Sequence, residues 1–197
     1  RITYDGEIQY PKLPSDGAVN FLKNDPRVAG ILLTITTWTK CDSDYEYNPT
    51  TNLFTELGLQ PKGEYDAHDD LVATEVTVKS HDGTMVPLSI IHKQGLKLDG
   101  SNPCLLMGYG AYGFSFDPFY KQTQCAWYER GGIFAIAHVR GGGEHGEEWY
   151  RAGFQQTKPN TWKDFIACAE YLIEQKYTSP AKLAGEDVSV GGILIGR

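Results

Sequence analysis

Ser189 is the residue whose surroundings best suit covalent chemistry. It lies in the run Asp187-Val188-Ser189-Val190-Gly191-Gly192, which follows a strand-like segment at 182–185 and precedes an apolar helix start at 193–195. A serine on a tight strand-to-helix turn is held in a strained backbone conformation that exposes its hydroxyl, an arrangement called the nucleophile elbow. The pattern predicts a nucleophile for acyl transfer. The alternative is an ordinary glycine-rich turn.

Acyl transfer also needs hydrogen-bond donors where the oxyanion forms. One predicted donor is the backbone N–H of Val190, directly after the serine. The second is expected from the loop after the third strand of such a domain. That loop is the run 108–113, where glycines free the backbone and the hydroxyls of Tyr109 and Tyr112 are available as donors. The alternative is that both tyrosines are packing residues.

A general base for Ser189 is not expected within this sequence. All five histidines precede the serine: His68, His81, His92, His138 and His145. In hydrolases with a nucleophile elbow the chain order is Ser, then Asp, then His. A set of His138, Asp164 and Ser189 in the opposite order belongs to an all-β double barrel, which the strand–helix alternation of this chain contradicts. The partners of Ser189 are therefore predicted to lie outside these residues.

The glycine run at 140–146 resembles a phosphate cradle only superficially. It lacks the Gly-Lys-Ser/Thr ending of a P-loop, and Glu144 would repel phosphate. We interpret it as a connector near the site, in which Glu144 or Glu147 pairs with Arg140 or Arg151. The four cysteines have no short spacing, so no metal, redox motif or disulfide framework is predicted, and no cofactor is expected.

Bulk properties exclude several classes of function. The net charge of −7 argues against a dedicated nucleic-acid binder, and no stretch approaches the ~20 apolar residues that span a bilayer. Cys104 and Cys168 lie in apolar patterns and are interpreted as core thiols, which mildly favours a reducing compartment such as the cytoplasm. The sequence begins at Arg1 and stops inside an apparent helix. We therefore expect a piece of a longer protein, so that a missing signal peptide is uninformative.

The pattern changes between residues 1–66 and 70–197, which predicts two domains. The first part is rich in Thr, Tyr and turn formers. It contains a strand at 31–38 and a hairpin formed by 44–47 and 53–57, closed by the turn 48–52. Pro49 presets the first turn position, and Asn48 can bond its own backbone. Short antiparallel strands at this spacing predict a meander that could be one blade of a propeller.

The second part predicts an α/β domain. A hairpin at 72–79 and 85–92 turns at Asp82-Gly83, and short buried strands are expected at 104–107 and 133–137. The clearest helix spans about 162–175, with Thr161 and Asp164 as a capping-box signal. Its expected apolar stripe is Trp162, Phe165, Ile166, Ala169, Leu172 and Ile173. Together these elements predict a mostly parallel sheet led by an antiparallel hairpin.

Five motifs occur together, in order and with fitting spacing: the loop 108–113, the run 140–146, the helix residues 164–165 and 169–173, the segment 177–180, and Ser189 with Gly191 and Gly192. None is specific alone, but the ordered set closely resembles the prolyl oligopeptidase family of serine peptidases. The resemblance covers about residues 70–197. The segment 1–66 fits the end of that family's N-terminal β-propeller.

The resemblance implies an α/β-hydrolase domain beneath a seven-bladed propeller that admits short peptides, in a monomeric protein. It implies cleavage through an acyl-enzyme, usually after proline and in some relatives after basic residues. By position, Ser189 resembles the nucleophile, Tyr109 the oxyanion-hole phenol, and Val190 the backbone donor. Tyr112 resembles an aromatic that lines the pocket for the residue before the cleaved bond. The triad Asp and His would lie beyond Arg197, so this chain alone is expected to be inactive.

Two positions depart from the family pattern. Asp187 replaces a usual glycine two residues before the serine, and Val190 replaces Asn or Ala. A carboxylate at 187 crowds a tight turn and brings negative charge near a developing oxyanion. Only the backbone N–H of Val190 is needed. Other α/β hydrolases, such as an acylaminoacyl peptidase or an esterase, stay open as alternatives, as does a degenerate peptide-binding homologue in which Asp187 marks lost catalysis.

Overall fold

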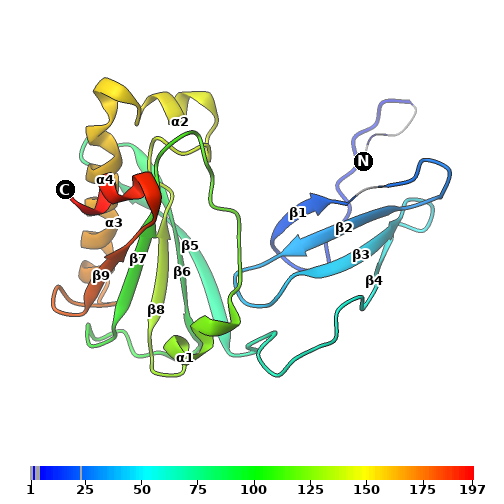
Figure 1. Cartoon of the computed structure of the whole chain (residues 1–197), viewed down its shortest axis with the longest axis horizontal. Coiled ribbons are helices and arrows are strands. Elements are labelled where there is room, and N and C mark those ends of the chain that lie inside the picture. Colours follow the sequence, from blue (N-terminus) through cyan, green and yellow to red (C-terminus); the bar gives the residue numbers. More distant parts are fainter. Residues whose placement is uncertain (1, 3–4, 23) are drawn as a thin grey trace. The chain divides into compact units, whose positions relative to one another are not determined.

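The computed structural model describes residues 2, 5–22 and 24–197. The chain divides into two compact units (Figure 1). The first comprises residues 1–68 together with 117–122, and the second comprises 69–116 and 123–197. The boundary near residue 68 lies close to the change in sequence pattern. The segment 117–122 departs from a simple division, because it leaves the second unit and packs with the first.

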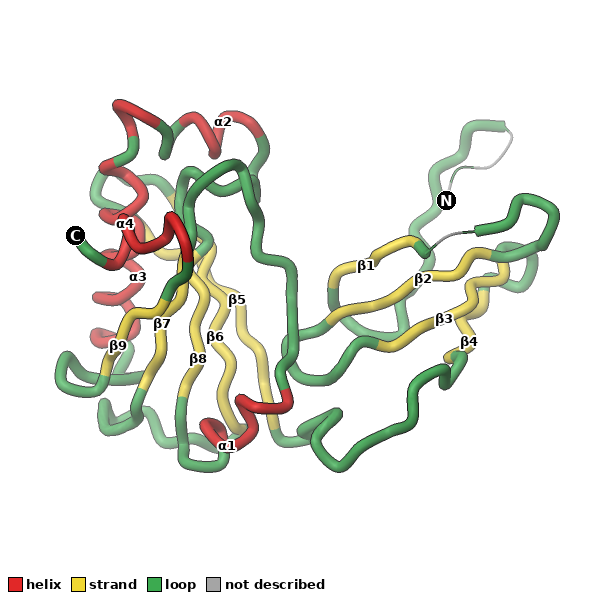
Figure 2. Tube along the Cα trace, in the orientation of Figure 1, coloured by secondary structure: helices red, strands yellow, loops and turns green. Residues whose placement is uncertain are grey.

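The first unit contains a four-stranded antiparallel sheet in the order β1-β2-β3-β4 (Figure 2). Its strands are β1 (Ala18–Phe21), β2 (Ile31–Thr36), β3 (Ser43–Asn48) and β4 (Leu53–Glu56). A small core lies on one face of β2 and β3 and consists of Leu33, Ile35, Tyr45 and Tyr47. The predicted meander is therefore present.

Local hydrogen bonds explain the β3–β4 turn. The side-chain oxygen of Asn48 accepts the N–H groups of Thr50 and Thr51 at 2.9 and 3.2 Å. Asn52 adopts a φ of 57°, in the left-handed region that asparagine tolerates better than most residues. The predicted turn at 48–52 is confirmed, together with its mechanism.

The second unit is built on a five-stranded sheet in the order β5-β6-β8-β7-β9. Its strands are β5 (Leu71–Lys79), β6 (Met85–Lys93), β7 (Cys104–Gly108), β8 (Ile133–Ala137) and β9 (Leu183–Glu186). The pairs β5–β6 and β6–β8 are antiparallel, whereas β7–β8 and β7–β9 are parallel. The predicted α/β architecture with an antiparallel start is confirmed.

β8 occupies the centre of this sheet, and its sequence explains why. All five of its side chains are buried, and an uninterrupted apolar run is typical of a strand covered on both faces. Helix α3 (Pro159–Glu174) contacts β5, β6 and β8 on one face of the sheet. The shorter helices are α1 (Cys125–Tyr128), α2 (Glu147–Arg151) and α4 (Gly192–Ile195), and 3-10 turns occupy Gln122–Gln124, Gln155–Thr157 and Ser189–Gly191.

The predicted apolar stripe of α3 is confirmed in large part, because Leu172 lies in the core and Trp162, Phe165 and Ala169 pack against it. The helix begins at Pro159, and its fully buried side chains are Thr161, Asp164, Cys168 and Leu172. Ile166, which the apolar periodicity placed inside, is 47% exposed. The predicted capping box at Thr161 and Asp164 is also wrong, since both residues lie within the helix. Thr161 and Asp164 are buried although they are polar, because each one binds Arg140, which follows β8.

Candidate active site

The two loops of the predicted site leave the sheet side by side. β7 pairs in parallel with β9, and Met107 lies opposite Glu186 at the end of the ladder. Neighbouring strands lie about 4.8 Å apart, and parallel strands end at the same edge of a sheet. Tyr109 follows β7 directly, and Ser189 follows β9 after two residues. The topology thus brings the oxyanion loop and the serine turn to one edge.

Ser189 has the strained backbone that the sequence predicted. Its φ is 60°, in the left-handed region that is costly for a residue with a Cβ atom. The preceding residue, Val188, is extended with φ −133° and ψ 153°. The N–H of Gly191 donates to the carbonyl oxygen of Val188 at 3.0 Å and closes the turn. Ser189 is exposed, so its side chain is accessible.

Val190 follows the serine in the first turn of the 3-10 helix. The N–H groups that open a helix have no carbonyl partner within it, so such a group is free to bind an acceptor beside Ser189. The Val190 side chain is half-buried. This placement fits a backbone donor whose side chain plays no direct part.

The two tyrosines of the loop 109–113 occupy different environments. The half-buried Tyr109 packs edge-on against Phe114, with ring centroids 5.6 Å apart. Tyr112 has a φ of 57° and is 75% exposed. A packing role therefore explains part of the Tyr109 surface, but it does not explain Tyr112, whose strained backbone presents an aromatic ring to solvent.

The structure does not support a catalytic set of His138, Asp164 and Ser189, the alternative in which the histidine comes first in the chain. The Nε2 atom of His138 lies 2.9 Å from the hydroxyl oxygen of Ser89, and its Nδ1 atom lies 3.5 Å from Glu144. Asp164 binds Arg140 and Ser80 instead. His138 and Asp164 therefore contribute to two separate buried clusters. Within the described residues, neither of them forms a hydrogen bond or ion pair with Ser189.

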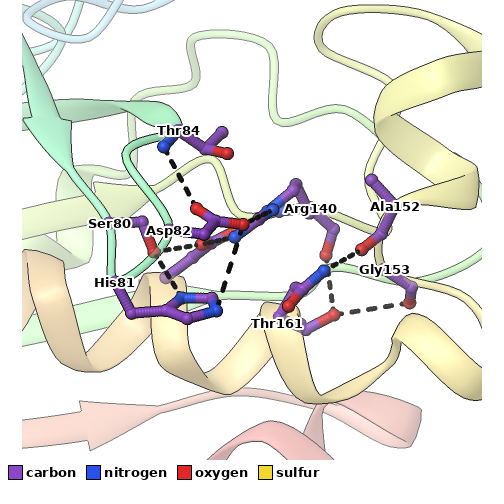
Figure 3. A network of polar contacts seen from close by, with 10 residues as sticks. Ser80, His81, Asp82, Thr84, Arg140, Ala152, Gly153 and Thr161 are labelled. Atoms are coloured by element: carbon purple, nitrogen blue, oxygen red, sulfur yellow. Dashed lines mark hydrogen bonds and ion pairs between the residues drawn. The ribbon is translucent and has the colours of Figure 1, made fainter.

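A buried ionic network supports the loop that follows β8. The Arg140 guanidinium donates to Asp164 at 2.7 and 2.8 Å. It also donates to Asp82 at 2.6 Å (Figure 3). The Thr161 hydroxyl donates to the Arg140 carbonyl at 2.7 Å, and the Ser80 hydroxyl donates to Asp164 at 2.6 Å. The Asp164 hydrogen bonds raise the pKa of Arg140, and the Arg140 hydrogen bond holds the pKa of Asp82 well below its usual value.

The pairing predicted for Arg140 is therefore wrong, whereas the one for Arg151 is confirmed. Arg151 contacts Glu147 at 2.7 Å on the surface of α2. Arg140 is only 4% exposed, and a buried charge needs well-placed opposite charges. The signal that sequence reasoning missed was Asp164, an acidic residue on the inward side of a helix.

Asp187 is crowded in the way the sequence predicted. Its carboxylate packs against Gly191 so closely that an added Cβ at 191 would lie 2.0 Å from the Asp187 Cγ atom. One oxygen, Oδ1, accepts the N–H of Val188 at 2.7 Å. Within the described chain the other oxygen, Oδ2, is buried without a hydrogen-bond partner. Burial raises the pKa of Asp187 to about 6, and the neighbouring Glu186 contributes to the increase.

Residues 2, 5–22 and 24–197 contain no group of three or more His, Cys, Asp or Glu side chains that could hold a metal ion. No helix in the same residues combines the length and the apolar character required to cross a membrane.

A sheet of this order, with a serine on a strained turn after β9, defines an α/β-hydrolase domain. Residues 118–197 match the Prolyl oligopeptidase family. The prolyl endopeptidase of Elizabethkingia meningoseptica is 36% identical over 94% of this chain and 26% of its own length. The chain belongs to the prolyl oligopeptidase family.

Solved structures give the same result. The apo structure of prolyl oligopeptidase B from Galerina marginata is similar with a TM-score of 0.81 and 34% identity, over 98% of this chain and 28% of that one. Oligopeptidase B from Leishmania major has a TM-score of 0.77 and 34% identity, over 86% and 24%. The chain thus spans about a quarter of the length of these relatives.

Proposed function

We propose that this chain is part of a serine peptidase that hydrolyses short peptides, with proline preferred before the cleaved bond. Ser189 attacks the peptide carbonyl to form an acyl-enzyme, and the Val190 N–H and the Tyr109 hydroxyl bind the oxyanion. Tyr112 contributes to the pocket for the residue before the cleaved bond. The observation that carries the proposal is the accessible Ser189 with φ 60°, at the sheet edge where the Tyr109 loop also begins.

The names of the relatives support the substrate class. The relative from Elizabethkingia meningoseptica is a prolyl endopeptidase, and a structure of the Galerina marginata enzyme contains a 25mer macrocyclization substrate. The triad Asp and His would be supplied by residues outside 1–197. Without them a serine hydrolase retains only the rate provided by its oxyanion site and by substrate binding, so the chain alone is proposed to be inactive.

Labelling with a fluorophosphonate tests this assignment. We expect the full-length protein to be labelled at Ser189, its Ser189→Ala variant to remain unlabelled, and the 197-residue chain to react negligibly. Absence of label in the active full-length protein would reject Ser189 as nucleophile. Stoichiometric labelling of the 197-residue chain would show instead that the absent residues are not required.

Asp187 favours a second candidate, a homologue that binds peptides without cleaving them. Its partly buried carboxylate packs against Gly191 of the serine turn, and negative charge close to the site would oppose an oxyanion. If the protein is a peptidase, Asp187→Gly in the full-length protein should raise kcat/KM on a prolyl peptide amide, since it removes that charge. If the protein only binds, calorimetry should detect the peptide while no product forms in either form.

A further inference from the structure

Lys158 lies just before α3 and reaches the loop that follows β7. Its ammonium donates a 2.5 Å hydrogen bond to the carbonyl oxygen of Gly110, and its side chain is half-buried. Gly110 directly follows Tyr109. One lysine outside the two site loops therefore holds the peptide unit between Gly110 and Ala111, which begins one residue after the proposed oxyanion tyrosine.

The backbone at Gly110 has little room to move. Its φ is 64°, and an added Cβ would lie 2.3 Å from a Thr161 methyl carbon and 2.7 Å from a Val139 methyl carbon. The Gly110 carbonyl oxygen is also close to Gly141, where an added Cβ would lie 2.0 Å from it. Because packing fixes the peptide on these sides, the Lys158 bond adds an electrostatic restraint to a loop already confined in shape.

The same ammonium acts on the serine turn through charge. The pKa of Asp187 depends on the burial of its carboxylate and on three neighbouring groups: the Val188 N–H, the Glu186 carboxylate and the Lys158 ammonium. Of these, Glu186 disfavours ionisation, while the Val188 N–H and Lys158 favour it. Conversely, burial lowers the pKa of Lys158, and the charge on Asp187 opposes that change. Lys158 is the cation among the groups that act on this carboxylate.

We propose that Lys158 is a positioning residue that couples the two loops of the site, because its ammonium holds the Gly110 carbonyl in the loop that begins at Tyr109, and its positive charge also acts on the Asp187 carboxylate in the turn of Ser189. The inference rests on the proposed function, since it assumes that these loops bind the oxyanion. It assigns Lys158 no contact with substrate. The positive charge of Lys158 favours the ionised form of Asp187 and at the same time partly offsets its negative charge, which would oppose negative charge on a substrate oxygen.

Carboxyl NMR on the 197-residue chain tests the charge coupling independently of activity. We expect Lys158→Gln to raise the measured pKa of Asp187 further above about 6, as removal of an opposite charge does. Lys158→Arg should leave it close to the wild-type value. The matched control is Lys163→Gln, because Lys163 is exposed and lies in α3, five residues after Lys158. The variant Asp187→Asn assigns the signal. An unchanged Asp187 pKa in folded Lys158→Gln would overturn the proposal.

Kinetics on the full-length protein test the positioning role. Lys158→Gln should lower kcat on a prolyl peptide amide at least about tenfold with little change in KM, since misplaced oxyanion donors affect the transition state most. Lys158→Arg should restore most of the rate, and Lys163→Gln should match wild type. An unaltered kcat in Lys158→Gln overturns the proposal. Failure of Ser189 to label, with the NMR result intact, instead counts against the proposed function.

Discussion

Asp187 places an ionisable group where the turn around Ser189 is tightest. Its Oδ2 atom is buried without a hydrogen-bond partner in the described chain, and burial favours the neutral carboxyl. Ionisation at neutral pH therefore acts against the folded turn. Lys158 opposes this effect, so the stability and the chemistry of the site depend on the same two side chains.

The free energy of unfolding should depend on pH through the ionisation of Asp187. The folded pKa of Asp187 is raised to about 6 from 3.8, so the folded state binds the proton more tightly. Its contribution to stability is therefore present at pH 4 and lost as the pH rises through 6. We expect the free energy of unfolding of Asp187→Asn at pH 8, measured by denaturant unfolding, to exceed that of wild type. The expected difference is about 1 kcal/mol after allowance for solvent screening. Parallel stability curves from pH 4 to 8 would contradict the expectation.

Two adjacent glycines in the turn should respond oppositely to alanine. An added Cβ at Gly191 meets the Asp187 carboxylate, whereas nothing lies within 4 Å of one at Gly192. Both glycines have helical φ values, −59° and −55°. Gly191→Ala should therefore destabilise the chain by about 1–3 kcal/mol, while Gly192→Ala should stabilise it by about 0.4–1 kcal/mol.

A double-mutant cycle by urea denaturation identifies the cause. The three atoms nearest the added Cβ at Gly191 all belong to Asp187. Most of the cost of Gly191→Ala should consequently disappear in an Asp187→Gly background. An undiminished cost there would mean that the backbone, rather than the carboxylate, limits the turn.

At the scale of elements, α3 is held to the sheet by ionic as well as apolar contacts. Asp164 lies in the buried face of the helix, and Arg140 follows the end of β8. The Asp82 turn between β5 and β6 binds the same guanidinium. One arginine therefore joins a helix, a hairpin turn and the glycine run 141–143.

Removal of this arginine should be severe. Arg140→Met leaves Asp164 buried without its opposite charge, and the expected loss is about 3–5 kcal/mol at pH 7 by urea denaturation. Arg151→Met removes an ion pair whose side chains are 72% and 64% exposed, and it should change stability by less than about 0.5 kcal/mol. Similar losses in the two variants would show that burial does not determine the strength of these pairs.

The features predicted correctly from sequence are those that local residues determine. The run Ile133–Ala137, the turn at Asn48 and the strained turn at Ser189 each carry their cause within a few positions. The Arg140 network could not be found in this way, because its partners lie 24 and 58 positions away. For the same reason the burial of Asp164 in α3 was missed, since hydrophobic periodicity counts Asp164 as polar and hence exposed. The Lys158 contact with Gly110 spans 48 positions and left no local signal either.

At the scale of the whole molecule, the two units differ in how much apolar surface each one buries. The second unit has a buried cluster that extends across β5 to β8 and includes residues of α3 and α4. The buried cluster of the first unit, within its described residues, consists of Leu33, Ile35, Tyr45 and Tyr47 on a four-stranded sheet. A unit with fewer buried contacts needs less free energy to unfold locally.

Native-state hydrogen exchange should separate the units. Amides of β8, the central strand of its sheet, should exchange only through global unfolding, whereas amides of β2 and β3 should exchange at a lower free energy. The measurement is the denaturant dependence of exchange for each strand. Equal protection and equal slopes would indicate that the chain unfolds as a single cooperative unit.

The excursion of residues 117–122 also determines how this chain can be recombined. Because that segment clusters with the first unit, the polypeptide passes between the units near residues 68, 116 and 122. A chimaera spliced at a single junction near 68 would carry a foreign sheet together with the native segment, whose Tyr120 hydroxyl binds the Tyr65 carbonyl at 2.9 Å. Chimaeras made from related sequences should therefore fold when residues 1–68 and 117–122 come from the same parent.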